Sequence, residues 1–218
     1  MSFSENHHFD LATEGWCNPT DWNFVKDIQD DILAIKGEIM SLMKHQPLLV
    51  NKLGFGQDSW IMRELSFREM SVVVEEWIIR GGFHYNQIGY DSRMKGEWKT
   101  LPIFMSDRPE TISLSKRYFP YLYSIISKIP NVSFVGLFKQ SSHGQIATHS
   151  HINDCRIFHF LLNDLHNGHC WIEVNSERRM MQNIGDCLAF DVRFPHSSGN
   201  CSQLDRTNLV IEVMSKDD

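Results

Sequence analysis

The last quarter of the chain, residues 149–206, decides the fold. It opens on Thr148-His149-Ser150-His151, and it closes on Phe194-Pro195-His196, with Arg206 ten residues further on. Short apolar segments separated by turn residues lie between these ends. Side chains alternate along an extended chain, so His149 and His151 share one face. This pattern predicts two imidazoles that can bind one metal ion together.

Five segments of the C-terminal half have the apolar, β-branched composition of short strands. They are residues 132–138, 155–162, 169–174, 187–190 and 207–213. Asn167-Gly168 is a favoured two-residue hairpin turn, and it is predicted to join the second of these strands to the third. Several short strands with regular turns indicate a sandwich or a barrel.

The N-terminal part has helical periodicity. From about Thr20 to Lys44, apolar residues recur at helical spacing and predict one buried stripe. A second helix is expected to start at Pro120 and to end before Pro130. Residues 83–98 are rich in aromatic and polar side chains, which is typical either of an edge strand and turn or of a rim that faces a substrate.

Composition excludes some classes of protein. At 218 residues the chain suits one domain with embellishments, and 42% hydrophobic with 22% charged residues is ordinary for a globular protein. A net charge of −6 argues against a nucleic-acid or anionic-membrane partner. No apolar run approaches the roughly 20 residues that span a bilayer. The start has no signal-peptide pattern, and five cysteines without a CxxC pair indicate free thiols, so a cytoplasmic location is expected.

The histidines suggest iron chemistry. Non-haem Fe(II) oxygenases bind iron with two His and one carboxylate and leave the opposite face open. In that chemistry a 2-oxo acid chelates the iron, and O₂ takes the last position. The far carboxylate of such a cosubstrate needs a planar, bidentate partner, which an arginine such as Arg206 provides. A lone histidine is more often a hydrogen-bonded structural residue, and we interpret His143, His166 and His169 in this way.

A family resemblance strengthens this interpretation. Phe190-Asp191, His196, Asn200, Ser202 and Arg206 resemble the pattern of the aspartyl/asparaginyl β-hydroxylases. These are Fe(II)- and 2-oxoglutarate-dependent dioxygenases, a family that includes bacterial proline cis-4-hydroxylases. Supporting similarities are found in residues 98–102, 129–132, 144–146, 153–156 and 195–199. The resemblance covers about residues 96–213, and the first 95 residues match only loosely.

The resemblance implies a fold and a set of site residues. It implies a double-stranded β-helix, or jelly roll, over residues 96–218, with residues 1–95 as a helical substrate wall packed on it within one structural domain. His149 and His196 would be catalytic iron ligands, and Arg206 would bind the distal carboxylate of 2-oxoglutarate. The implied reaction hydroxylates an sp³ carbon of an amino acid, an amino-acid-like metabolite or a peptidyl Asp/Asn-type side chain. O₂ is consumed, and 2-oxoglutarate is converted to succinate and CO₂.

Two departures from the family pattern leave alternatives open. The position two residues after the first ligand is His151 here, where many of these oxygenases have Asp and the β-hydroxylases have Gly. Either His151 completes a three-histidine metal site or water fills the position, and Asp154 is a weaker candidate. The family's Arg-x-His appears with altered spacing as Arg156 and His159. His159 is expected either to contact the metal-binding end of the cosubstrate or to be a buried histidine bonded to backbone.

Two rival functions remain. The first is a three-histidine, cupin-type dioxygenase without 2-oxoglutarate, which His151 favours and Arg206 disfavours. The second is a non-catalytic barrel used as a binding module. In each enzymatic reading the expected partner is a small molecule or a peptide side chain, not nucleic acid or a membrane.

Overall fold

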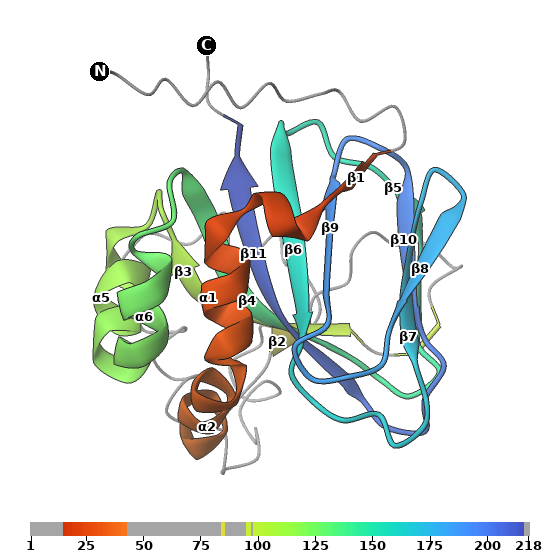
Figure 1. The fold of residues 1–218 in the computed structure, drawn as a ribbon, viewed down its shortest axis with the longest axis horizontal. Helices are drawn as coiled ribbons and strands as arrows, with labels where there is room; N and C mark the ends of the chain where they lie inside the picture. Colours follow the sequence, from red (N-terminus) through yellow and green to blue (C-terminus); the bar gives the residue numbers. More distant parts are fainter. Residues whose placement is uncertain (1–14, 43–83, 86–94, 97, 216–218) are drawn as a thin grey trace.

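Two antiparallel sheets lie face to face and form the walls of a flattened barrel (Figure 1). This computed structural model describes residues 15–42, 84–85, 95–96 and 98–215. The larger sheet contains, in spatial order, β1 (Trp16–Cys17), β9 (Cys187–Asp191), β6 (Cys155–Leu161), β11 (Arg206–Met214), β4 (Val132–Gln140), β3 (Trp98–Met105) and β2 (His84–Tyr85). The smaller sheet contains β5 (Gln145–His149), β10 (His196–Asn200), β7 (Cys170–Val174) and β8 (Glu177–Met181).

The order of the strands makes this fold a double-stranded β-helix. From β4 to β11 the chain crosses between the two sheets at every step, except at the hairpin that joins β7 to β8. The predicted jelly-roll class is therefore confirmed. Each of the five predicted strands is present, although some bounds differ by one or two residues.

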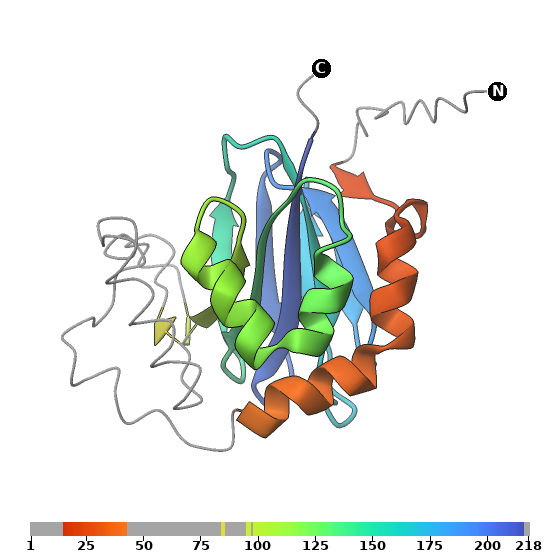
Figure 2. The ribbon, with the colours of Figure 1, turned by 90° about the vertical axis from the view of Figure 1, so that its left-hand side faces the viewer.

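The helices cover the outer face of the larger sheet (Figure 2). They are η1 (Pro19–Asp21), α1 (Asn23–Asp30), α2 (Ile32–Leu42), α5 (Pro109–Tyr118) and α6 (Pro120–Ile126). The apolar stripe expected between residues 20 and 44 is confirmed, because Val25, Ile28, Ile32, Ile35 and Ile39 are all buried. The single helix expected there is wrong, since Asp31 ends α1 and α2 starts at the next residue.

Alternation along β11 separates two cores. Leu209, Ile211 and Val213 face the helices and belong to the outer core. Val210 belongs to the inner core between the sheets. Arg206 and Asn208 precede Val210 with the same parity, so they also point into the barrel. The inner wall of the barrel therefore carries polar side chains beside apolar ones.

The predicted hairpin at Asn167-Gly168 is wrong. The turn exists, because His166 and Asn167 have φ values of 46° and 69°, and the Gly168 amide donates to the Leu165 carbonyl. The strands on either side, β6 and β7, lie in different sheets and do not pair. Turn residues determine a local reversal of the chain, and the partner of each strand is determined by the core that it buries.

The cysteines, the helices and the N-terminal region were also the subject of expectations. All five cysteines are free thiols, as predicted. Within the described residues, no helix has the length and hydropathy that a membrane crossing would require. Most of the rim expected at residues 83–98 lies outside the described residues, and so does most of the expected N-terminal wall. The division of the chain near residue 95 stays a prediction.

Glu38 of α2 caps α6, and its removal should destabilise the protein. Helix α6 has no side-chain cap of its own, and the Glu38 carboxylate accepts from the amides of Tyr121 (2.8 Å) and Leu122 (3.0 Å). We expect Glu38→Ala to lower the free energy of unfolding by about 1–2 kcal/mol, measured by urea denaturation. Glu38→Gln should lose less, and the exposed Met40→Ala should lose almost nothing. Equal losses for Glu38→Ala and Met40→Ala would contradict the capping role.

Candidate metal centre

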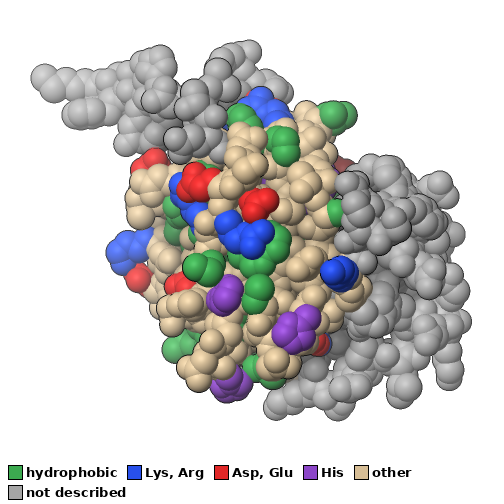
Figure 3. Space-filling model, turned by 90° about the vertical axis from the view of Figure 1, so that its right-hand side faces the viewer, with side chains coloured by type: hydrophobic (Ala, Val, Ile, Leu, Met, Phe, Trp, Pro, Cys, Tyr) green, Lys and Arg blue, Asp and Glu red, His purple; other side chains and the backbone are tan. Residues whose placement is uncertain are grey.

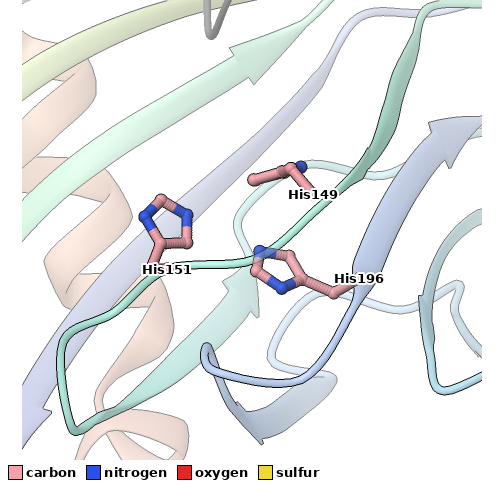
Figure 4. Close-up of side chains that lie close together, drawn as sticks. All are labelled: His149, His151 and His196. Atoms are coloured by element: carbon pink, nitrogen blue, oxygen red, sulfur yellow. The ribbon is translucent and has the colours of Figure 1, made fainter.

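Three histidines converge at one end of the smaller sheet (Figure 4). His149 ends β5 and His196 begins β10, and the two residues are directly paired in the antiparallel register. His151 follows two residues after β5, where its amide donates to the carbonyl of Val192. One nitrogen atom from each ring lies within 4.8 Å of the other two, a spacing that could hold a metal ion.

Backbone carbonyls orient two of the rings. Nδ1 of His149 lies 2.9 Å from the carbonyl oxygen of Ala147, and Nδ1 of His196 lies 2.8 Å from that of Phe194. A carbonyl oxygen can only accept, so in each ring Nδ1 carries the proton and donates it. The lone pair is then on Nε2. Metal-binding histidines are commonly oriented in this way.

The electrostatic environment keeps His196 neutral. Burial, and then the nearby His149, lower the pKa of His196 to about 3. A neutral imidazole is the form that binds a metal. His196 is buried, His149 is half-buried and His151 is exposed, so the cluster extends from the barrel interior to the surface.

An ionic cluster supports the turn that leads to His196. The carboxylate of Asp191 contacts Arg156 at 3.0 Å and Arg193 at 2.7 Å. Asp154 contacts the same two guanidinium groups at 2.9 Å and 3.1 Å. Asp154, the weaker ligand candidate, therefore lies in this ionic cluster and outside the group of three histidines.

Arg206 lies inside the barrel with part of its guanidinium unsatisfied. Its side chain is 1% exposed, and Nε and Nη1 have no hydrogen-bond partner among the described residues. Gln140 is its register partner on β4, and both amide atoms of Gln140 also lack partners. Oδ1 of Asn208, the next inward residue of β11, is a third such group. A cluster of buried, unpaired polar groups is rare in a folded protein and is an expected feature of a ligand site.

His159 lies near both Arg206 and His196. Its Nδ1 is 3.2 Å from the amide nitrogen of Asn208, and its ring stacks on Phe190 with centroids 5.8 Å apart. Burial lowers the pKa of His159, and the nearby Arg206 and His196 lower it further. The bond to backbone considered for this residue is wrong, because its partner is a side chain. Its contact with a cosubstrate stays a prediction.

Asn200 and Ser202 hold the loop that delivers Arg206. The Asn200 amide nitrogen lies near three backbone carbonyls, those of Gln140 (3.3 Å), Ser141 (3.0 Å) and Leu204 (2.7 Å). Its oxygen accepts from the amide and the hydroxyl of Ser202. These two motif residues therefore join the end of β4 to the start of β11 and fix where Arg206 enters the barrel.

The sequence does not single out Gln140 or Asn208. Asn208 has the same parity as Arg206 in a predicted strand, so a polar residue at an inward position was the available signal. Gln140 lies two residues beyond the strand expected at 132–138, and nothing local identifies it.

A hollow of about 260 Å³ lies beside the histidine cluster, lined by residues that include His196, Glu173, Ser197 and Thr148. Glu173 and Ser197 adjoin the inward-facing Val174 and His196 and so point outward. Figure 3 shows this side of the molecule, where acidic, basic, histidine and hydrophobic side chains are interspersed. The hollow therefore lies at this outer face, and His196 is part of its lining.

The fold and the site define a jelly-roll protein with a possible three-histidine metal centre. The family model described as aspartyl/asparaginyl beta-hydroxylase matches residues 69–216, and the chain belongs to this family. The resemblance drawn from the sequence is confirmed. A search of curated proteins finds no significant match.

Solved structures give distant similarities. A predicted oxalate decarboxylase from Thermotoga maritima is 14% identical, with a TM-score of 0.41, over 61% of this chain and 94% of that chain. The cupin domain of Cnp3 from Schizosaccharomyces pombe is 9% identical, with a TM-score of 0.39, over 59% of this chain and 74% of that chain. At TM-scores this low, neither similarity bears on function.

Metal binding should depend on the three histidines. We expect the protein to bind one Co(II) per chain in calorimetry, with Co(II) as an air-stable substitute for Fe(II). His149→Ala and His196→Ala should abolish this binding. His151→Ala should weaken it by roughly tenfold or more, since even indirect contacts to a metal contribute that much. His166→Asn is the control, because His166 is exposed and Asn tolerates its positive φ. Unchanged affinity in His151→Ala would assign the third position to water.

Asn200 should contribute strongly to stability. Its side chain is 2% exposed, and Asn200→Ala leaves several buried loop groups without partners. We expect the free energy of unfolding to fall by about 2–3 kcal/mol in urea denaturation. Ser142→Ala, which removes one hydroxyl bond to the Ser202 carbonyl in the same loop, should lose less than about 1 kcal/mol. Similar losses for both variants would show that Asn200 does not organise the loop.

Proposed function

We propose that this protein is an Fe(II)- and 2-oxoglutarate-dependent hydroxylase that oxidises an sp³ carbon of an amino acid, an amino-acid-like metabolite or a peptidyl Asp/Asn-type side chain. The observation that carries the proposal is the buried, partly unpaired guanidinium of Arg206. It lies inside the same barrel as the histidine cluster, in a chain that belongs to a hydroxylase family.

The histidine cluster suits a divalent transition metal. Neutral imidazole nitrogens suit iron as well as zinc and copper, and three ligands on one side of the ion leave other positions open. The proton on Nδ1 of His149 and His196 leaves Nε2 to bind the metal. His149, His196 and His151 are therefore the proposed ligands, with His151 in the place of the usual carboxylate.

The environment of Arg206 suits the distal carboxylate of a 2-oxo diacid. Burying a cation without a counter-ion is costly, so an anionic ligand would stabilise the folded protein. Nε and Nη1 have no partner, and a guanidinium can bind a carboxylate through two parallel hydrogen bonds. The unpaired amide of Gln140, opposite Arg206 in the register, offers a further donor.

The remaining inward residues can orient and shield the reacting groups. When bound, iron and 2-oxoglutarate supply the oxidising chemistry that transfers one oxygen atom of O₂ to a C–H bond, with succinate and CO₂ as the coproducts. Phe190 packs against both His159 and His196 and excludes water from that wall. Asn208 fixes the ring of His159, the residue proposed to contact the metal-binding end of the cosubstrate. The cytoplasmic location stays a prediction.

The alternative is a three-histidine dioxygenase that binds its substrate directly to the metal. The inclusion of His151 in the cluster favours it. This alternative leaves the buried charge of Arg206 without a role, and for that reason we prefer the 2-oxoglutarate reading.

The test compares two ligands that differ by one carboxylate. We expect the Mn(II)-loaded protein to bind 2-oxoglutarate at least about tenfold more tightly than 2-oxobutyrate, which lacks the distal carboxylate, in calorimetry. In Arg206→Met this preference should disappear, while Mn(II) affinity is retained. With Fe(II) and O₂, the wild-type protein should form succinate.

Thermal unfolding of the Mn(II)-loaded protein provides a second measurement. Because Arg206→Met removes a buried unpaired charge, it should unfold at the same or a higher temperature than wild type without 2-oxoglutarate. 2-Oxoglutarate should raise the unfolding temperature of the wild-type protein but not that of Arg206→Met. Equal affinity of the wild-type protein for both ligands would contradict the proposal and would favour the three-histidine alternative.

A further inference from the structure

A second unpaired charge lies on the inner wall of the barrel, at the opposite end of β11 from Arg206. Glu212 is six residues after Arg206 and has the same parity as Arg206, Asn208 and Val210. It pairs with Phe134 of β4 and with Ile157 of β6, and Ile157 belongs to the inner core. The side chain of Glu212 therefore projects from the inner face of the larger sheet.

The carboxylate of Glu212 has no counter-ion among the described residues. Phe134 and Ile157, its register partners, are apolar, and the titratable group that interacts with it is the thiol of Cys155. Burial raises the pKa of that thiol to about 12, so it is neutral. Arg156 is close in the register but has the opposite parity to Ile157, and its guanidinium contacts Asp154 and Asp191.

The surroundings of Glu212 disfavour a charge and yet remain accessible. Burial raises the pKa of Glu212 to about 7, and no hydrogen bond or charge from the described part of the chain offsets it. The side chain is nevertheless partly exposed, so a ligand can reach it. A carboxylate in this state is costly to ionise, and a cationic partner would remove that cost.

The position of Glu212 relates it to the metal centre. Phe190, Ile157 and Glu212 occupy one row across β9, β6 and β11. The ring of Phe190 lies 4.9 Å from the ring of His196. Two strand spacings, about 10 Å, separate Phe190 from Glu212 along this row. A small molecule held at Glu212 could therefore extend to the histidine cluster, from the side away from Arg206.

We propose that Glu212 is the substrate-binding carboxylate of this protein and that the substrate carries a cationic nitrogen, an ammonium or a guanidinium group. This inference rests on the proposed function and specifies its substrate class. Arg206 binds the anionic cosubstrate at one end of the barrel wall, and Glu212 binds the cationic substrate at the other. The carbon to be hydroxylated then lies between the bound cation and the metal.

The test uses pairs of probes in which one cationic nitrogen is either present or neutralised. The full-length protein, loaded with Mn(II) and 2-oxoglutarate, is titrated in calorimetry with L-arginine and L-citrulline, and with L-lysine and its Nα- and Nε-acetyl derivatives. We expect at least one cationic probe to bind about tenfold or more tightly than the matched neutral one. Glu212→Gln should abolish this difference without changing the affinity for Mn(II) or 2-oxoglutarate. Glu173→Gln on the outer face is the matched control and should keep the difference.

Thermal unfolding shows whether Glu212→Gln remains folded. The folded-state pKa of Glu212 is raised, so the stability present at low pH is lost as the pH rises through about 7. Glu212→Gln should therefore unfold at a higher temperature than wild type at pH 8, with a smaller gain at pH 4. A higher unfolding temperature together with lost cation preference supports a binding role.

Two outcomes would overturn the inference. One is that no cationic probe binds better than its neutral counterpart, and the other is that Glu212→Gln keeps the preference. The same titrations report 2-oxoglutarate binding separately. If wild type binds 2-oxoglutarate but has no cation preference, the substrate inference alone fails. If wild type does not bind 2-oxoglutarate, the proposed function fails.

Discussion

The pairing of His149 with His196 across β5 and β10 is the constraint on which the site depends. It places the last residue of one strand opposite the first residue of another, 47 positions apart in the chain. The pairing holds only if the intervening strands cross correctly between the two sheets. The Asp191 ionic cluster and the Asn200 hydrogen bonds support the connections on either side of β10. The strand topology that folds the C-terminal half therefore also sets the geometry of the histidine cluster.

Strand β11 organises the barrel interior in a second way. The outward residues Leu209, Ile211 and Val213 are aliphatic and pack in the outer core with the helices. The inward residues change from cationic Arg206 through Asn208 and Val210 to acidic Glu212. Within the described ranges of the chain, both charges are at least partly without partners. It therefore stores an electrostatic cost at each end of one strand, and a ligand of the opposite charge lowers that cost at each place. The proposed recognition of two different ligands thus relies on one strand and the alternation of its side chains.

Much of this arrangement could be predicted from local sequence. The features that could not be predicted depend on contacts between residues far apart in the chain. Alternation and turn residues identified the five strands, and the spacing from Phe190 to Arg206 identified the family. The turn at His166 and Asn167 could not reveal that β6 and β7 belong to different sheets, because a turn does not specify the partner of a strand. Gln140 and Glu212 are important because their buried polar groups lack partners among the described residues. This property arises only after distant strands have packed. β10 has the sequence His-Ser-Ser-Gly-Asn, whose polar residues have low strand propensity, so its pairing with β5 and β7 makes it a strand.

The charged strand β8 has a consequence for the behaviour of the protein in solution. β8 contains Glu177, Arg178 and Arg179, and it forms an outer edge of the smaller sheet. Arg178 lies over the ring of Trp171, and Arg179 lies over that of Trp16. An open edge of this kind presents unpaired backbone groups to other molecules, and bulky charged side chains discourage another strand from adding to it. The charged residues of β8 therefore disfavour edge-to-edge pairing of this strand with a strand of another copy.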